Sequence, residues 1–206
     1  MSTETEDVDL WRGKTGFKPC FSTNETWLQI RKLGTPCAWG KGIWFSQATP
    51  KFAFMTWIAA RNRLATMDRI SYWNQGVDST CVLCKAAQET RNHLFFQCTF
   101  SSQLWEQLVK GILRNAHTQN WDDIIELISV STMERKKTLS LRYAFQISVY
   151  TIWRERNKRR HGDSPMPLQV LLKLTDKAIR NKLSLIQKKR VKGMDTILQF
   201  WFSTRL

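Results

Sequence analysis

The stretch that decides how this chain folds reads CVLCKAAQETRNHLFFQC and runs from Cys81 to Cys98. Two residues separate Cys81 from Cys84, eight separate Cys84 from His93, and four separate His93 from Cys98. Zinc prefers four thiolate or imidazole ligands in a tetrahedron, and a C-x2-C turn presents two thiolates to one ion. We predict one structural Zn²⁺ bound by Cys81, Cys84, His93 and Cys98.

The alternative is that these are three small buried cysteines and an ordinary histidine, because free Cys often behaves as a small hydrophobe. Three of the five Cys and one of the three His fall within eighteen positions, however, which favours a metal site. A Cys3His set suits zinc better than ions that prefer oxygen. Four protein ligands leave no open position, so the site is expected to be structural rather than catalytic.

Composition indicates a globular body. The chain has 206 residues, of which 42% are hydrophobic and 12% aromatic, whereas disordered chains are poor in such residues. No stretch approaches the roughly 18–20 apolar residues of a membrane span, and the acidic N-terminus is unlike a secretory signal. We therefore expect a protein of the nucleus or cytoplasm, with the nucleus favoured, and no membrane partner.

Outward from the metal motif, spacing predicts helices. Pro50 opens one with Thr49 as its cap, and a short one covers Asp68–Trp73. Further helices are expected from Ser101 or Ser102, from Asn120, and over Leu168–Lys192. No clear helix is expected between Trp27 and Trp44.

The segment from Lys136 to Arg160 is apolar on several sides and lacks Gly and Pro, which indicates a central buried helix. Its β-branched and aromatic content keeps a strand open for Ala144–Thr151. We predict a mainly α, bundle-like fold with a small zinc-stapled loop and an irregular N-terminal segment. The expected parts are a loose acidic lead-in (1–25), a zinc-binding region (26–130) and a basic helical C-terminal region (131–206).

Several runs together resemble the plant reverse transcriptase zinc-binding domain, found near the C-terminus of polyproteins of LINE-type (non-LTR) retrotransposons. The runs are PKFAFMTWIAARNRL from Pro50 to Leu64, Asp68-Arg69, Cys81-x2-Cys84, the stretch from Glu89 to Cys98, and Trp105. The resemblance implies a short retroelement-derived protein whose zinc ligands are the four residues named above. It implies a module that helps to hold nucleic acid.

Catalytic motifs of such polyproteins are not found. There is no Tyr-x-Asp-Asp sequence, and the acidic residues are too scattered to propose the carboxylate pairs of two-metal chemistry. We therefore expect no enzyme.

Charge points to a polyanionic partner. The formal net charge is +15, and residues 152–193 hold thirteen basic and three acidic residues, about +10 of that total. Candidate phosphate contacts are Arg154, Arg156, Lys158, Arg159, Arg160, Lys173, Lys177, Arg180, Lys188, Lys189 and Arg190. Trp73, Phe95 and Phe96 are candidates for stacking on bases, although core positions are favoured for them.

The sequence thus predicts a non-catalytic zinc module that binds RNA or DNA with low sequence specificity. A protein-interaction or scaffold domain, or a retroelement remnant without a selected role, remains the alternative. RNA versus DNA and protein partners stay open.

Overall fold

The structure is a computed structural model, and it describes residues 9–13, 15–32, 37–130 and 132–205. The chain consists of two compact units, Met1–Cys37 (unit 1) and Ala38–Leu206 (unit 2). The first eight residues of the expected acidic lead-in lie outside the described residues. The domain boundaries expected after residues 25 and 130 stay predictions.

Unit 1 contains a short hairpin and one helix. Strand β1 (Trp11–Gly13) pairs antiparallel with β2 (Gly16–Lys18). Helix α1 (Thr23–Ile30) starts after Ser22, whose Oγ accepts a hydrogen bond from the Glu25 amide at 3.3 Å. The expectation of no clear helix between Trp27 and Trp44 is wrong for the four-residue helix α2 (Gly40–Ile43) and for the second half of α1. For α1 it overlooked Ser22 as a helix cap.

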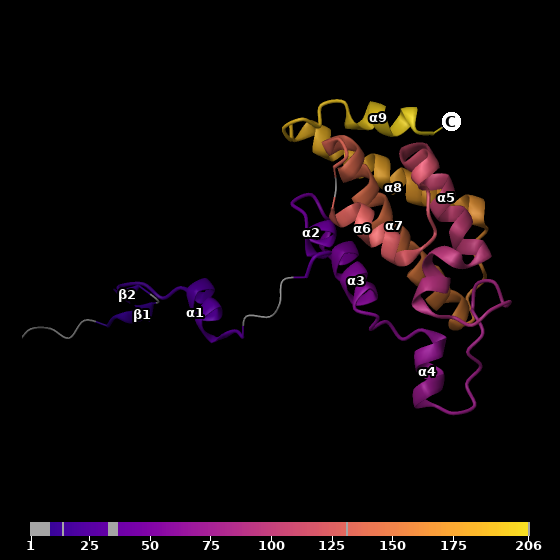
Figure 1. Cartoon of the computed structure of the whole chain (residues 1–206), viewed down its shortest axis with the longest axis horizontal. Coiled ribbons are helices and arrows are strands. Elements are labelled where there is room, and N and C mark those ends of the chain that lie inside the picture. Colours follow the sequence, from indigo (N-terminus) through magenta and orange to yellow (C-terminus); the bar gives the residue numbers. More distant parts are fainter. Residues whose placement is uncertain (1–8, 14, 33–36, 131, 206) are drawn as a thin grey trace, which may run out of the picture. The chain divides into compact units, whose positions relative to one another are not determined.

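Unit 2 is mainly helical (Figure 1), as predicted. Its elements are α2 (Gly40–Ile43), α3 (Pro50–Ala60), α4 (Met67–Trp73), the π turn η1 (His93–Gln97), α5 (Thr99–Leu113), the 3-10 turn η2 (Arg114–Ala116), α6 (Trp121–Ser129), α7 (Arg135–Arg160), α8 (Leu168–Lys188) and α9 (Ile197–Ser203). None of the helices in the described part of the chain combines the length and apolarity needed to cross a membrane.

Helix α7 lies at the centre of unit 2 and contacts α3, α5, α8 and η1 (Figure 1). Its 26 residues confirm the helix that the sequence favoured over a strand. In the segment that kept a strand open, Phe145, Ile147 and Val149 are buried because helices cover several sides of α7.

Helix α8 ends earlier than predicted, at Lys188 instead of Lys192. Arg190 and Gly193 adopt positive φ angles of 49° and 77°, which are incompatible with a continuing α-helix. The chain then turns into α9, which the sequence did not predict. Ile197 and Trp201 of α9 are fully buried.

An aromatic cluster joins η1 to the helices around it. The Phe96 ring lies 5.0 Å from Trp105 of α5, 5.6 Å from Trp121 of α6 and 5.6 Å from Phe145 of α7, between ring centroids. Phe95 and Phe96 are completely buried. Both are therefore core residues, as the sequence favoured, and neither is available to stack on bases.

The contact between α5 and the end of α9 gives a test of this packing. A Cβ at Gly111 would collide with the backbone of Thr204. Gly111→Ala is therefore expected to lower the free energy of unfolding by about 1–2 kcal/mol, because overpacking outweighs the gain in helix propensity. Urea denaturation measures the change. Lys110→Ala, one residue earlier and exposed, should stay within about 0.5 kcal/mol of the parent. A more stable Gly111→Ala variant would contradict the packing.

Candidate metal centre

The C-x2-C turn is fixed by backbone hydrogen bonds. The Cys81 amide donates to the Ala87 carbonyl at 2.7 Å, and the Lys85 amide donates to the Cys81 carbonyl at 2.9 Å. Lys85 takes a left-handed conformation with φ of 57°, which reverses the chain directly after Cys84. The turn therefore places the two thiols on the same side of the loop.

A π turn supplies the other two candidate ligands. The Cys98 amide donates to the His93 carbonyl at 2.7 Å, closing a hydrogen bond over five residues. His93 and Cys98 are therefore brought to one side of η1. Three of the side chains between them, Leu94, Phe95 and Phe96, are buried in the core.

The four ligand atoms converge. The Cys81 and Cys98 sulfurs lie 3.9 Å apart, Cys84 Sγ lies 3.3 Å from His93 Nε2, and all four atoms lie within 4.8 Å of one another. Zinc–sulfur and zinc–nitrogen bonds of about 2.3 and 2.0–2.1 Å give tetrahedral edges of about 3.8 Å between two sulfurs and about 3.6 Å between sulfur and nitrogen. The donor set and its spacing fit zinc. Among the described residues, this is the one group of three or more His, Cys, Asp or Glu side chains so arranged.

The sulfurs of Cys81 and Cys98 shift each other's pKa. The hydrogen bond from the Cys81 thiol lowers the pKa of Cys98 to about 5, and amides at the start of α5 add to this effect. The same contact, followed by burial, raises the pKa of Cys81. Zinc, when bound, would hold the sulfurs as thiolates.

A buried ion pair lies directly behind the metal centre. Glu89 and Arg156 are both fully buried, and Arg156 Nη2 lies 2.7 Å from Glu89 Oε1. Glu89 also accepts hydrogen bonds from the amides of Met67 at 3.0 Å and Val82 at 3.1 Å. This carboxylate therefore joins the C-x2-C turn, the start of α4 and helix α7.

Arg159, one turn further along α7, supports the same loop. Its guanidinium donates to the Leu83 carbonyl at 3.3 Å and pairs with Glu155 at 2.7 Å. Glu155 in turn accepts from the Met166 amide at 2.9 Å. The metal loop, α7 and the hinge before α8 are thereby connected.

These contacts correct part of the predicted phosphate-binding set. Arg156 is buried and forms an ion pair with Glu89, so it is not available to bind phosphate. Arg159 is half-buried, forms an ion pair with Glu155 and donates a hydrogen bond to the Leu83 carbonyl. Sequence reasoning missed this role, although a signal existed: Arg156 continues the buried stripe of Phe145, Val149 and Ile152 at spacings of three and four.

Most of the remaining candidates are exposed. Arg180 pairs with Asp176 at 2.8 Å and is half-buried. The exposed ones are Arg154, Lys158, Arg160, Lys173, Lys177, Lys188, Lys189 and Arg190. Within the part of the chain that the structure describes, none of these eight forms an ion pair with an acid.

Six of the eight exposed cations fall into two groups at opposite ends of α8, and Lys173 and Lys177 lie between them on α8. Arg154, Lys158 and Arg160 lie near the end of α7, whereas Lys188, Lys189 and Arg190 follow twenty residues of α8, about 30 Å away. The fold also brings Arg135, at the start of α7, next to Gly193 beyond the second group. The sequence alone did not place Arg135 there, because 58 positions separate it from Gly193.

The geometry defines a helical protein with a Cys3His cluster whose donor set and spacing fit a tetrahedral zinc ion. Residues 21–105 match the model of the family described as zinc-binding in reverse transcriptase. The matched region contains all four ligands and ends within α5, before the basic helices α7 and α8. Comparisons with curated proteins and with solved structures find no match.

The buried pair yields a stability prediction. Arg156→Met leaves the Glu89 carboxylate buried without its cation, so the free energy of unfolding should fall by about 3–5 kcal/mol. Thermal or urea unfolding measures this loss. Arg154→Met on the same helix is the matched control, because Arg154 is exposed. Equal stability of the two variants would contradict the role of Arg156.

Proposed function

We propose that this chain is a non-catalytic, zinc-stapled module of retrotransposon origin that binds RNA or DNA with little sequence preference. The observation that carries this proposal is the set of eight exposed cations on and beside α7 and α8 that form no ion pair with any acid in the described part of the chain. Basic side chains that are not neutralised by local acids attract the phosphate backbone and release its counterions on binding.

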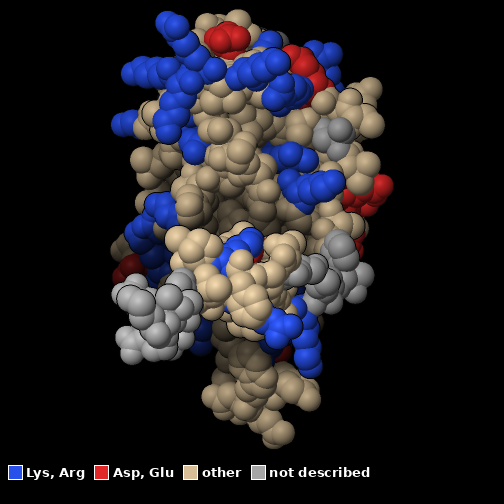
Figure 2. Space-filling model, turned by 90° about the vertical axis from the view of Figure 1, so that its left-hand side faces the viewer, with Lys and Arg blue, Asp and Glu red and all other residues tan. Residues whose placement is uncertain are grey.

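One of the two groups forms a strongly basic end of unit 2. In Figure 2, Lys and Arg side chains outnumber acidic ones at the upper end of the molecule, where α8 ends and the chain turns into α9. This end includes Lys188, Lys189, Arg190 and Lys192, all exposed. A concentration of one sign of charge produces a local potential that attracts a polyanion.

Two members of the other group, Arg154 and Lys158, border a groove between α3, α7 and α8 with a volume of about 280 Å³. Lys51 and Arg154 lie 5.3 and 5.6 Å from the centroid of the Tyr150 ring, and Lys158 is part of the same wall. Leu174 and Ala178 of α8 supply an apolar side. This combination of cations, an aromatic ring and apolar surface suits a nucleotide chain, whose phosphates and bases need different contacts.

The metal would serve this function indirectly. One Zn²⁺ held by Cys81, Cys84, His93 and Cys98 would supply four bonds that close the loop, with no open position for a substrate. The family match supports a zinc-binding domain. The proposal of no catalysis rests on the scattered acids: among the described residues no second cluster capable of holding a metal accompanies the Cys3His set.

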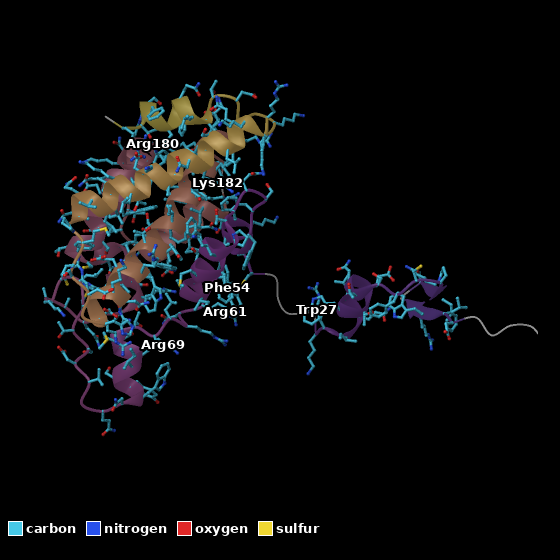
Figure 3. All side chains as sticks on the ribbon, turned by 180° about the vertical axis from the view of Figure 1, so that it is seen from behind. Trp27, Phe54, Arg61, Arg69, Arg180 and Lys182 are labelled. Atoms are coloured by element: carbon cyan, nitrogen blue, oxygen red, sulfur yellow. The ribbon has the colours of Figure 1, made fainter. Side chains whose placement is uncertain are left out.

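Protein interaction is the second candidate, and unit 1 favours it. Helix α1 has no buried residue, and Trp27 and Ile30 are 59% and 71% exposed. Figure 3 shows Trp27 on this unit. Exposed apolar groups of this size are typical of contact surfaces, so unit 1 could recruit a protein partner while unit 2 binds nucleic acid.

We also propose a nuclear location. The exposed run from Lys188 to Lys192 has the composition of a nuclear-localisation patch. Substitution of its basic side chains is a better test than truncation, because removing the C-terminus would delete the buried Ile197 and Trp201 of α9.

Salt dependence tests nucleic-acid binding. Affinity for a single-stranded oligonucleotide should fall steeply with salt, and the logarithmic slope should weaken by about 0.7 for each phosphate contact removed. The triple variant Lys188→Ala, Lys189→Ala, Arg190→Ala should therefore lower the slope by about 2, as should Arg154→Ala, Lys158→Ala, Arg160→Ala. Fluorescence anisotropy titrations at several salt concentrations measure it.

The control for these triples is Lys110→Ala on α5, where Lys110 pairs with Glu106 at 2.8 Å. Its slope should equal that of the parent. Absence of binding to any oligonucleotide at low salt, or slopes unchanged in both triple variants, would refute the proposal.

A further inference from the structure

Helix α4 extends away from the other helices of unit 2 (Figure 1) and exposes aromatic side chains. Met67 is the one residue of α4 that is buried. Tyr72 and Trp73, at the far end, are 86% and 62% exposed. Single exposed apolar groups are ordinary. Two adjacent exposed aromatic rings at the end of a projecting helix are a candidate binding surface.

Two arginine–tryptophan pairs lie on or directly beside these helices: Trp57 of α3 with Arg61 just after its end, and Arg69 with Trp73 of α4. The Arg61 guanidinium lies 5.7 Å from the Trp57 ring centroid, and the Arg69 guanidinium lies 5.2 Å from that of Trp73. In each pair the residues are four positions apart, the spacing that places side chains on one face of a helix. Each guanidinium is thus held against an indole ring by a cation–π interaction.

Phe54 extends the same surface along α3. It is 53% exposed, and its ring centroid lies 5.8 Å from that of Trp57 with an interplanar angle of 30°. Figure 3 shows Phe54, Arg61 and Arg69 following one another from α3 into α4. We call this surface the aromatic–arginine ridge, and it comprises Phe54, Trp57, Arg61, Arg69, Tyr72 and Trp73.

Basic residues outnumber acidic ones in the sequence around the ridge. Between positions 50 and 77 the chain has four basic residues and a single acid, Asp68. The Asp68 carboxylate already accepts hydrogen bonds from the Thr66 hydroxyl and the Arg69 amide. Asp78, just beyond, accepts from the Thr80 amide and hydroxyl. Neither Arg61 nor Arg69 forms an ion pair with an acid among the residues that the structure describes.

From these observations we propose that the aromatic–arginine ridge binds single-stranded nucleic acid, with bases on the exposed rings and phosphates on Arg61 and Arg69. This inference rests on the proposed function and adds the substrate class. Bases of a single strand have accessible faces, whereas those of a duplex are stacked inside the helix. The surplus of cations favours a phosphate backbone over an apolar protein surface.

The metal centre orients the ridge. The Met67 amide donates to the Glu89 carboxylate at 3.0 Å, and the Asp68 amide donates to the Glu89 carbonyl at 3.2 Å. Glu89 lies between the ligands Cys84 and His93 in the sequence. The first turn of α4 is therefore fixed to the zinc loop, while its aromatic end projects.

The test compares a fluorescein-labelled oligo(dT) with a duplex of the same length at low salt, using the full chain. The variant Tyr72→Ala with Trp73→Ala should lose at least about fivefold in single-strand affinity, the effect of removing one stacked base. Its duplex affinity should change by less than about twofold, and its salt slope should equal that of the parent, because stacking removes no phosphate contact.

Trp73→Phe is the rescue variant, because an aromatic ring at that position still stacks, and it should keep most of the single-strand affinity. Phe202→Ala on α9, which removes a ring that is 51% exposed elsewhere, is the matched control and should behave as the parent. Circular dichroism verifies that each variant is folded.

Three outcomes overturn the inference. They are an unchanged single-strand affinity in the double variant, an equal loss for single strand and duplex, and a Trp73→Phe variant as weak as the alanine variant. In each case oligonucleotide binding by the parent chain leaves the proposed function intact. A parent chain that binds neither probe would instead refute the proposed function itself.

Discussion

The closure of the segment between Cys81 and Cys98 is the constraint on which the core of unit 2 depends. Four ligand atoms within 4.8 Å of one another require the chain to return on itself. The π turn that brings His93 beside Cys98 also directs Phe95 and Phe96 into the core. Trp105, Trp121 and Phe145 pack around Phe96. Without the closed loop, helices α5, α6 and α7 would lose the side chain that joins them.

The basic residues of α7 have two different functions in this arrangement. Arg156 and Arg159 point toward the metal loop and hold it through Glu89 and the Leu83 carbonyl. Arg154, Lys158 and Arg160 are exposed. One helix thus carries both the support of the zinc loop and the cations proposed to contact phosphate. A substitution on α7 therefore has to be interpreted according to which side of the helix it changes.

The metal ligands and most helix starts could be predicted from the sequence, because they depend on residues that are close together in the chain. The ligand spacing gave the metal centre, and Pro50, Thr66 and Asn120 marked helix starts. Long-range contacts could not be predicted in this way. Nothing near Glu89 in the sequence indicates that its partner is Arg156, 67 positions later. The end of α8 at Lys188 depends on a left-handed backbone at Arg190, a conformation that arginine rarely adopts.

Metal analysis of the purified chain, before and after treatment with a chelator, tests the central claim most directly. The account predicts about one zinc per chain, because four ligands saturate one tetrahedral ion. Its removal should abolish the near-ultraviolet circular dichroism of the buried tryptophans, since ligation and folding of the loop are coupled. Cys81→Ser should reproduce this loss and Cys37→Ser, at an exposed cysteine, should not. A wild-type chain that is free of metal and still fully folded would contradict the account.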